Sequence, residues 1–415
     1  MSDEPQRDTP GPLDGIRVIE LGSALTNYCG KLFAELGADV VLVEPPEGCD
    51  LRRQPPFVES NDGTTERSIT YFVQNTSKRS VVLDLEHADA RAVLARLAAS
   101  SDLVLDGHPP GALDRLGTGF VELSEANPAL VMTSVSPFGQ TGPYAHYAYS
   151  DLVCSAFGGL LWMGGYADGP PVRPPGDQAY MAGALFAAVS SMIALTHAEL
   201  TGVGQHVDVS VQEAVTMGLE NAAQYYDLQH HIRRRFGGTQ RDAGFGVFPC
   251  RDGHVILLAS GIGGDRFWAS FVDWMEDAGV EGAATLREPG WGDSEFMITE
   301  EAKRQFWNIF TSYSLQKTKH DLYHEAHRWR VPLGPVNQPS DIYASAQLRA
   351  RGYFVGVEAF GRGVELPGAP YQLSETPWQM SGPAPRLGEH TADVLAEHGL
   401  ADDERERLFT IGAVA

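Results

Sequence analysis

IRVIELGSALTNYCGKLFAELGADVVLVEPP, residues 16–46, contains two short apolar runs separated by a stretch with helical spacing. The runs at 16–21 and 39–46 have the length and β-branched content of buried strands, and prolines stop the second one. Between them, GKLFAELGA (30–38) places apolar residues at helical spacing and ends at Gly37. Residues 16–46 therefore predict a β-α-β unit.

The same alternation continues along the chain. SVVLDL (80–85) and DLVLDG (102–107) read as strands around the Ala-rich helical stretch 88–100, and PALVMTSVSPFG (128–139) supplies another strand. QHVDVSVQEAV (205–215) reads as a strand that runs into a helix. Strands alternating with helices favour a parallel sheet covered on both faces, so the predicted fold class is α/β.

The length of 415 residues exceeds that of a single core and predicts two domains. The pattern of predicted elements changes between 233 and 340, where a Gly/Arg loop is followed by a strand and amphipathic helices. We therefore predict a large domain formed by residues 1–225 and 341–415, and a small domain with its linkers at 230–340.

Composition excludes several classes of partner. The formal net charge is −23, and no block rich in Lys and Arg interrupts it, so nucleic acid is not expected as a partner. The polar N-terminus does not resemble a signal peptide, and no run of 18 apolar residues appears, so we expect a cytoplasmic protein without a membrane span. Four cysteines without a CxxC spacing favour reduced, buried thiols.

Several common chemical motifs are missing. The first β-α turn, ELGSALTNYCG, lacks the GxGxxG spacing of a dinucleotide site, and no P-loop, GxSxG or HExxH occurs. His320, His324 and His327 would share one helix face, but no carboxylate ligand pattern accompanies them. A solvated surface stripe is the favoured interpretation, and no metal or permanently bound cofactor is predicted.

Asp177 is the most informative residue, because it stands between a Pro/Gly turn and a long apolar helix that begins at Gln178. As an N-cap its carboxylate would accept the first free N–H groups of that helix. As a nucleophile it would use the same ionised state to attack a thioester, with room for substrate left by small neighbours. Position alone leaves the two alternatives evenly balanced. The small neighbours are Gly176, Ala179 and Gly183.

Basic residues near strand ends are candidates for phosphate contacts in this acidic chain. They are Lys78, Arg79 and Arg115. Each of them taken singly is also compatible with an ordinary solvated charge.

Segments along most of the chain together resemble the class III CoA-transferase family, which includes formyl-CoA:oxalate and carnitine CoA-transferases and α-methylacyl-CoA racemase. The resemblance implies a Rossmann-like large domain, an inserted small domain and an interlocked dimer. The segments QAYMAG and GQHVDVSVQEAV resemble those of the benzylsuccinate-type members, which pair two similar chains. The segments are LDGIRVIEL, FAELGADVVLVEPP, NTSKRSVVLDL, PGALDRLG, NPALVMTSVSPFGQTGPY, GGYADGPPVRPPGD and ELTGVGQHVDVSVQEAV.

The resemblance assigns roles to particular residues. The family nucleophile corresponds to Asp177, and a Gly-rich loop that covers the active site corresponds to Gly237 and Gly238. His108 precedes PPG where the family has an aromatic residue near the adenine, so stacking is expected there. The resemblance therefore implies that coenzyme A enters as an acyl-CoA substrate and is not a permanently bound cofactor. The residues assigned to CoA binding are Asn75, Lys78, Arg79, His108, Arg115 and Phe138.

Departures from the family pattern narrow the activity. Thr26 and Asn27 replace a Gly-Pro step, and Ala24 replaces a Gln of oxalate-type enzymes, so formyl and oxalyl substrates are not expected. Pro45 stands where a basic residue often contacts the adenosine phosphates. Ser150 precedes Asp151 where racemases have His-Asp, so their second base is missing.

The predicted function is transfer of CoA between two carboxylic acids through an acyl-aspartyl anhydride and an aspartyl-CoA thioester on Asp177. Backbone N–H groups at 177–180 and in the loop of Gly237 and Gly238 are candidates for stabilising oxyanions. Two alternatives remain open at this point: a racemase that uses another base such as His146, and a silent CoA-binding subunit of a heteromeric transferase. A homodimer is the expected assembly, with a heteromer of similar chains as the alternative.

Overall fold

The structure, a computed structural model, describes residues 10–59, 68–219, 221–235, 237–260 and 264–415. The chain divides into two compact units, each described by itself below. The large unit comprises Met1–Leu160, Pro174–Gln224 and Arg349–Ala415, and the small unit comprises Leu161–Arg173 and Tyr225–Leu348.

A six-stranded parallel sheet forms the centre of the large unit. Its strand order is β3-β2-β1-β4-β5-β6, and every neighbouring pair is parallel. This order is that of a doubly wound Rossmann-like sheet, in which the winding direction reverses between β1 and β4. The predicted parallel α/β sheet is confirmed. The strands are β1 (Arg17–Leu21), β2 (Asp39–Glu44), β3 (Arg79–Val82), β4 (Leu103–Asp106), β5 (Val131–Ser136) and β6 (His206–Ser210).

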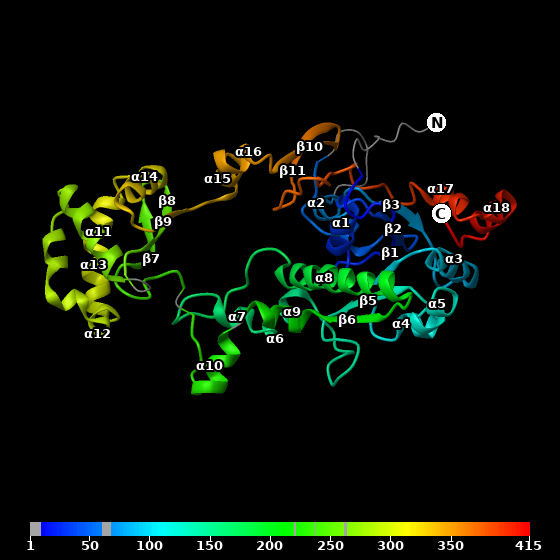
Figure 1. Ribbon diagram of the computed structural model, residues 1–415, viewed down its shortest axis with the longest axis horizontal. Helices are drawn as coiled ribbons and strands as arrows, with labels where there is room; N and C mark the ends of the chain where they lie inside the picture. Colours follow the sequence, from blue (N-terminus) through cyan, green and yellow to red (C-terminus); the bar gives the residue numbers. More distant parts are fainter. Residues whose placement is uncertain (1–9, 60–67, 220, 236, 261–263) are drawn as a thin grey trace. The chain divides into compact units, whose positions relative to one another are not determined.

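Apolar side chains alternate between the two faces of this sheet. Val18 and Ile19, neighbours on β1, belong to separate buried clusters, as the two-residue repeat of a strand requires. Two helical layers bury these faces (Figure 1). One layer contains α3 (Ala88–Ala99), α4 (Ala112–Leu116), α5 (Phe120–Ala126), α17 (Thr391–Glu397) and α18 (Asp402–Thr410). The other contains α1 (Asn27–Glu35), α6 (Asp151–Phe157), α8 (Gln178–Thr201) and α9 (Val211–Gly218).

Helix α8 is half core and half surface. It packs on α1, α6, α9 and strands β5 and β6 through small residues such as Ala187 and Ala194, which are buried. Length and composition alone would let α8 cross a membrane, which is weak support for a span because core helices of soluble proteins pass the same test. Its other side carries a stripe of exposed apolar residues, namely Leu185, Val189, Ile193 and Leu200.

A buried ion pair joins β1 to the start of β3. Lys78 Nζ lies 2.6 Å from Glu20 Oε2, and both side chains are fully buried. Burial raises the pKa of Glu20 and lowers that of Lys78, while their mutual attraction opposes both shifts. The Glu20 carboxylate fits only because α1 approaches the sheet at Gly30, where a Cβ atom would lie 1.8 Å from Oε2.

The remaining elements of the large unit follow β2 in the chain or belong to its C-terminal part. They are η1 (Asp50–Arg53), a 3-10 helix, then α2 (Ile69–Gln74), and the antiparallel pair β10 (Phe354–Ala359) and β11 (Arg362–Pro367).

An aromatic core holds the small unit together. Phe248, Phe271, Phe306 and Phe310 are fully buried and contact one another ring to ring. The antiparallel sheet β7-β8-β9 borders this core. The strand predicted from GHVILLAS (253–260) is confirmed, although it ends two residues earlier, and the amphipathic helices predicted after it are confirmed as well. The strands are β7 (Phe245–Cys250), β8 (Gly253–Leu258) and β9 (Leu333–Val336). The helices are α11 (Gly264–Asp277), η2 (Ala283–Arg287), η3 (Pro289–Gly292), α12 (Ser294–Met297), α13 (Glu300–Ser314), α14 (Lys319–Trp329) and α15 (Pro339–Tyr343).

The unit boundaries differ from the predicted domain boundaries at one internal segment and at 341–348, which were predicted as part of the large domain and belong to the small unit. Residues 161–173, predicted as part of the large domain, group with the small unit. Arg235 explains this, because its guanidinium donates to the carbonyl oxygens of Trp162, Tyr166 and Gly169. At three places the chain passes from one unit to the other within a short helix, namely within α7 (Leu160–Met163), α10 (Asn221–Gln229) and α16 (Ala346–Ala350).

Candidate active site

Asp177 is the N-cap residue of α8 by position, but its carboxylate makes no capping hydrogen bond to the first turn of the helix. The backbone carbonyl of Asp177 accepts from Met181 N, so the helix begins directly after it. The side chain of Asp177 therefore does not cap α8, whereas its role as nucleophile stays a prediction.

Asp151 takes that role from another helix. Its Oδ1 accepts the N–H of Ala179 at 2.8 Å and the N–H of Tyr180 at 3.1 Å, and the residue is buried. These are the second and third residues of α8, whose N–H groups an N-cap side chain ordinarily accepts. The two amides are thus already engaged, which corrects the expectation that the 177–180 helix start offers them to an oxyanion.

Asp177 faces a small cleft within the large unit. Neutral side chains make up its described lining, which consists of Ala24, Tyr28, Leu51, Gln54, Gln74, Tyr180 and Met181. Burial raises the pKa values of Tyr28 and Tyr180, so both phenols stay protonated and can donate hydrogen bonds at neutral pH. Oε1 of Gln74 is buried and has no hydrogen-bond partner among the described residues.

Small residues near Asp177 do not open space for a ligand. Ala179 is fully buried, and a Cβ atom on Gly183 would lie 2.8 Å from Val211 Cγ2. Both residues therefore allow α8 to pack closely on its neighbours. Ala24 does line the cleft of Asp177, so the small residue that replaces the family's Gln stands beside the nucleophile candidate.

A second, larger cleft of about 610 Å³ lies at the carboxyl edge of the sheet. Its walls follow β1 at Gly22, β2 at Pro45, β3 at Leu83 and β4 at His108. Ligands of open α/β sheets bind outside the carboxyl ends of the strands, where the winding direction reverses. This cleft includes the β1–β4 reversal and has the volume of a ligand site.

Three basic side chains line this larger cleft: Arg53, His108 and Arg115. Arg53 and Arg115 are exposed, and Nδ1 of His108 lies 2.8 Å from Asp106 Oδ1, which holds the imidazole in place. Pro45 lines the same cleft. The structure therefore brings together His108 and Arg115 as the sequence suggested, and adds Arg53 where Pro45 lacks a charge.

The short helix η1 connects the two clefts. Its residues Asp50 and Arg53 line the larger cleft, whereas Leu51 and the following Gln54 line the cleft of Asp177. The β1–α1 turn does the same with Gly22 and Ala24. The β1–α1 turn and the loop that carries η1 can thus both contact one elongated ligand that has phosphates at one end and a reactive group at the other.

Glu44 anchors the loop that carries η1. Arg52 donates from Nε to Glu44 Oε2 and from Nη2 to Oε1, each at 2.7 Å, and Ser80 Oγ donates to Oε1. Burial alone would raise the pKa of Glu44, but the hydrogen bonds and charge of Arg52 outweigh it and hold the pKa below the usual range of a glutamate. The Arg52 guanidinium also stacks over Tyr71, 3.9 Å from the ring centroid.

Asn75 and Lys78 lie elsewhere than expected for CoA contacts. The Lys78 ammonium donates to Glu20, to the Asn27 carbonyl oxygen and to Asn75 Oδ1, and neither Asn75 nor Lys78 is exposed. Asn27 donates to Asn75 as well. Inside the protein, Lys78 compensates the buried Glu20 carboxylate and Asn75 accepts a hydrogen bond from Lys78, and the role of both residues as CoA contacts stays a prediction.

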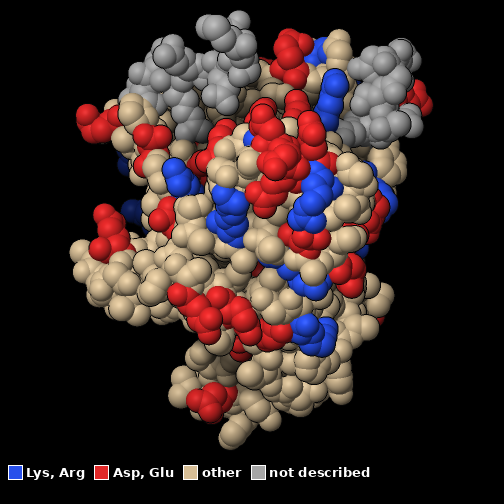
Figure 2. Space-filling model, turned by 90° about the vertical axis from the view of Figure 1, so that its right-hand side faces the viewer, with Lys and Arg blue, Asp and Glu red and all other residues tan. Residues whose placement is uncertain are grey.

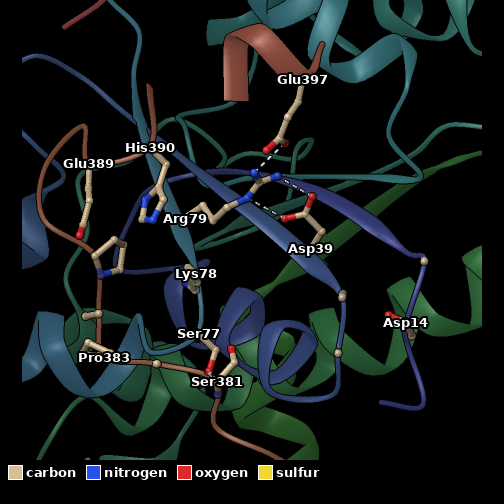
Figure 3. A pocket seen from close by; sticks show the side chains of 16 residues that line it. Asp14, Asp39, Ser77, Lys78, Arg79, Ser381, Pro383, Glu389, His390 and Glu397 are labelled. Carbon is tan, nitrogen blue, oxygen red and sulfur yellow. Dashed lines mark hydrogen bonds and ion pairs between the residues drawn. The ribbon is translucent and has the colours of Figure 1, made fainter. Parts of the chain in front are cut away.

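Arg79 lies at the opposite, amino edge of the sheet (Figure 3). Its guanidinium lies between Asp39 at 2.6 Å and Glu397 at 2.7 Å, in a hollow that His390 and Glu389 also line. Arg79 is therefore not near Arg115, and its prediction as a CoA contact does not fit this position. Phe138 is buried and packs edge-on against Tyr144 and Phe157, which makes it part of an aromatic cluster.

Gly237 and Gly238 lie in the small unit, both with left-handed backbone at φ 62° and 72°. A Cβ atom on Gly237 would lie 2.6 Å from Tyr166 Cα, so this turn requires glycine for two reasons. The two glycines form a tight turn against 165–166, and their role as a cover over Asp177 stays a prediction.

Surface charge agrees with the acidic composition. Figure 2 shows one face on which Asp and Glu side chains gather in groups and Lys and Arg lie between them. His320 and His324 are exposed with ring centroids 4.2 Å apart, and His327 is exposed as well. Within the described residues no group of three or more His, Cys, Asp or Glu side chains is arranged to hold a metal ion.

Sequence reasoning missed two residues of this site, Asp151 and Arg53. Asp151 lies 26 residues before Asp177 in the chain, and only the packing of α6 on α8 shows that it caps the helix. The sequence contains only a weak indication of Arg53. It is a basic residue after the second predicted strand and could replace the basic residue that is missing at Pro45.

Comparisons with known proteins agree with the geometry. The model of CoA-transferase family III matches residues 13–391. Succinyl-CoA:(R)-benzylsuccinate CoA-transferase subunit BbsE of Thauera aromatica is 41% identical over 96% of this chain and 97% of its own. Succinate–glutarate CoA-transferase of Agrobacterium fabrum is 33% identical over 96% and 98%. A crystal structure of a CAIB/BAIF family protein from Brucella suis superimposes with a TM-score of 0.84 at 27% identity, covering 94% and 100%.

Proposed function

The chain belongs to CoA-transferase family III and is a CoA-transferase, and on this premise we propose that Asp177 carries the acyl group and then CoA as CoA moves from an acyl-CoA donor to a carboxylic acid. The observation that supports this most is the pairing of two clefts by η1: one holds Asp177, and the other holds Arg53, His108 and Arg115. Guanidinium groups suit the phosphates of CoA.

The proposed chemistry is balanced without an external energy source. An oxygen of Asp177 bonds to the donor thioester carbon, and the C–S bond breaks to give an acyl-aspartyl anhydride and CoA thiolate. The thiolate bonds to the aspartyl carbon and releases the donor acid, which leaves an aspartyl-CoA thioester. The acceptor carboxylate displaces CoA to form a second anhydride, and CoA then takes the new acyl group and frees Asp177. Each intermediate stays activated.

Oxyanions that form on these carbonyl groups need hydrogen-bond donors. Because Asp151 engages the amides of Ala179 and Tyr180, we assign the role to the phenols of Tyr28 and Tyr180, which line the cleft and stay protonated. The turn at Gly237 and Gly238 is a further candidate, as the family resemblance implies. Gln74, whose buried Oε1 has no partner among the described residues, is proposed as a contact to the substrate.

Succinyl-CoA is the proposed donor, because the names of the relatives include it or its acid. Benzylsuccinate is the acceptor to test first and glutarate the second. Leu51, Met181 and two tyrosines give the cleft of Asp177 a partly apolar and aromatic lining, and because this cleft is small, a bulky acid would bind only if the cleft widens.

A second copy of the chain is proposed to cover the exposed apolar stripe of α8 in a homodimer. Several relatives carry the name of a subunit, so a heteromer with a similar chain is the alternative. The small domain inserted between two parts of the large one, the interlocked form of the dimer and a cytoplasmic location belong to the same proposal. The four cysteines are free and buried, which suits a reducing compartment.

Asp177→Ala tests the proposal. Transfer of CoA from succinyl-CoA should fall below detection, while CoA still binds through the larger cleft, since Asp177 contributes no contact there. Mass spectrometry after borohydride or hydroxylamine treatment should locate the covalent adduct on the peptide that contains Asp177 in the wild type only. Asp277→Ala, an exposed change on α11, serves as the matched control. Retained turnover in Asp177→Ala would contradict the assignment.

The racemase alternative gains no support from the structure. His146 is exposed and does not line the cleft of Asp177. Exchange of the α-proton of an acyl-CoA in D2O would reveal such an activity, and activity of the purified single chain would exclude a silent subunit.

A further inference from the structure

Asp151 engages the two amides at the start of α8 that an N-cap side chain would accept. Ordinarily the N-cap residue, here Asp177, accepts the N–H of the second or third helical residue. Both are engaged by Asp151 Oδ1, at 2.8 Å from Ala179 N and 3.1 Å from Tyr180 N. The helix therefore has a cap that does not come from its own N-cap side chain, and that side chain makes no capping bond.

The position of Asp151 is fixed independently of Asp177. Asp151 is the first residue of α6, whose own cap is Ser150, with Oγ accepting from Val153 N at 3.3 Å. Helix α6 packs on α8, and Cys154 in the next turn is fully buried. The positive ends of the helix dipoles of α6 and α8 thus meet at one buried carboxylate, an arrangement that stabilises its charge.

A carboxylate that accepts two backbone amides has its lone pairs engaged and attacks a thioester less readily. Without Asp151, the released amides of Ala179 and Tyr180 would lie within reach of the Asp177 side chain, as in an ordinary capped helix. We propose that Asp151 is a positioning residue: by occupying these two amides it keeps the Asp177 carboxylate from turning back to cap α8. This inference rests on the proposed role of Asp177 as nucleophile.

Two reactions of Asp177 test the inference separately. The first is labelling by a water-soluble carbodiimide and an amine, which measures the reactivity of the carboxylate without CoA chemistry. The second is formation of the covalent adduct from succinyl-CoA in a single turnover, trapped with borohydride. Both are quantified on the peptide that contains Asp177.

Asp151→Ala should slow both reactions by about tenfold or more, since hydrogen bonds of amides to a charged group are each worth that order. Asp151→Asn keeps a carbonyl oxygen that can accept both amides, so it should stay within about threefold of the wild type. Ser150→Ala removes the cap of α6 at the adjacent position and should also stay within about threefold. The KM for succinyl-CoA should not change, because Asp151 does not line the larger cleft.

Equal rates in Asp151→Ala and Ser150→Ala would overturn the inference, as would Asp151→Asn reacting as slowly as Asp151→Ala, because charge rather than capping would then matter. If Asp151→Ala does not fold, Asp151→Ser, whose hydroxyl is too short to hold both amides, is measured instead with the same expected slowing. A wild type that reacts with carbodiimide in an Asp151-dependent way but never forms the CoA adduct would remove the proposed function and leave the positioning role intact.

Discussion

Gly30→Ala places the smallest possible side chain against a buried ion pair. The new Cβ atom would lie 1.8 Å from Glu20 Oε2 and 3.0 Å from Lys78 Nζ. Non-bonded atoms do not approach to 1.8 Å, so the carboxylate must move by more than 1 Å from a position in which it lies 2.6 Å from Lys78. No exposed space is available, because both side chains are fully buried.

The magnitude follows from two opposing effects. Disrupting a buried ion pair costs about 3–5 kcal/mol, because it leaves a charge without compensation in the interior. Replacing Gly by Ala inside a helix returns about 1 kcal/mol of helix propensity. The net free energy of unfolding should therefore fall by about 2–4 kcal/mol, which corresponds to a melting temperature lower by roughly 5–15 °C in a domain of this size.

Differential scanning calorimetry measures this change, with Gly218→Ala as the matched control. Gly218 is also helical, in α9, but its Cβ atom would meet nothing within 4 Å, so this substitution should leave the melting temperature unchanged or raise it slightly. If Gly30→Ala melts within about 1 °C of Gly218→Ala, the account of Glu20 and Lys78 as a tightly enclosed pair is wrong.

Three other outcomes follow from the structure. Arg53→Ala should raise the KM for succinyl-CoA about tenfold or more with little change in kcat, and a proportional fall in kcat would argue against a ground-state phosphate contact. The hydrogen bonds and charge of Arg52 outweigh burial and lower the folded-state pKa of Glu44, so the pairing stabilises the fold above the unfolded pKa and this stability is lost as pH falls through the folded pKa. Acid unfolding of Glu44→Gln should show a shallower pH dependence, and an unchanged profile would exclude this linkage. Ile193→Glu should lower the melting temperature of the proposed dimer, because it places a charge on the apolar stripe of α8 that a second copy would cover, and an unchanged melting temperature would place the interface elsewhere.

Much of the large unit was predictable because each strand is a short apolar run bounded by turn residues. The β-α-β unit at 16–46, the strands near 80–85 and 102–107 and the strand–helix step at 205–215 all occur as expected. The strand order does not follow from this pattern, because an apolar run carries no information about which neighbour it pairs with. Residues 161–173 were misplaced for a similar reason: the contacts of Arg235 that hold them with the small unit join segments about 70 residues apart.

The site was predictable to a lesser degree. Sequence position made Asp177, His108 and Arg115 candidates, and the structure places the latter two in one cleft. It could not distinguish a cation aimed at a ligand from one paired inside the protein, which is why Lys78 was interpreted as a phosphate contact although it pairs with Glu20. Arg79 stands next to it in sequence but at the amino edge of the sheet, where two carboxylates hold it.

The order in which the chain is synthesised bears on how the large unit forms. Leu83, beside β3, forms a bridge with Val414, and Val394, Leu408 and Ala413 are buried in the same cluster as residues of β1 and α3. The part of this face that α17, α18 and Val414 cover thus stays open until residues 391–414 have left the ribosome. Apolar surface on the nascent strands therefore stays exposed while the small unit is translated. We expect chaperones to bind this surface during translation.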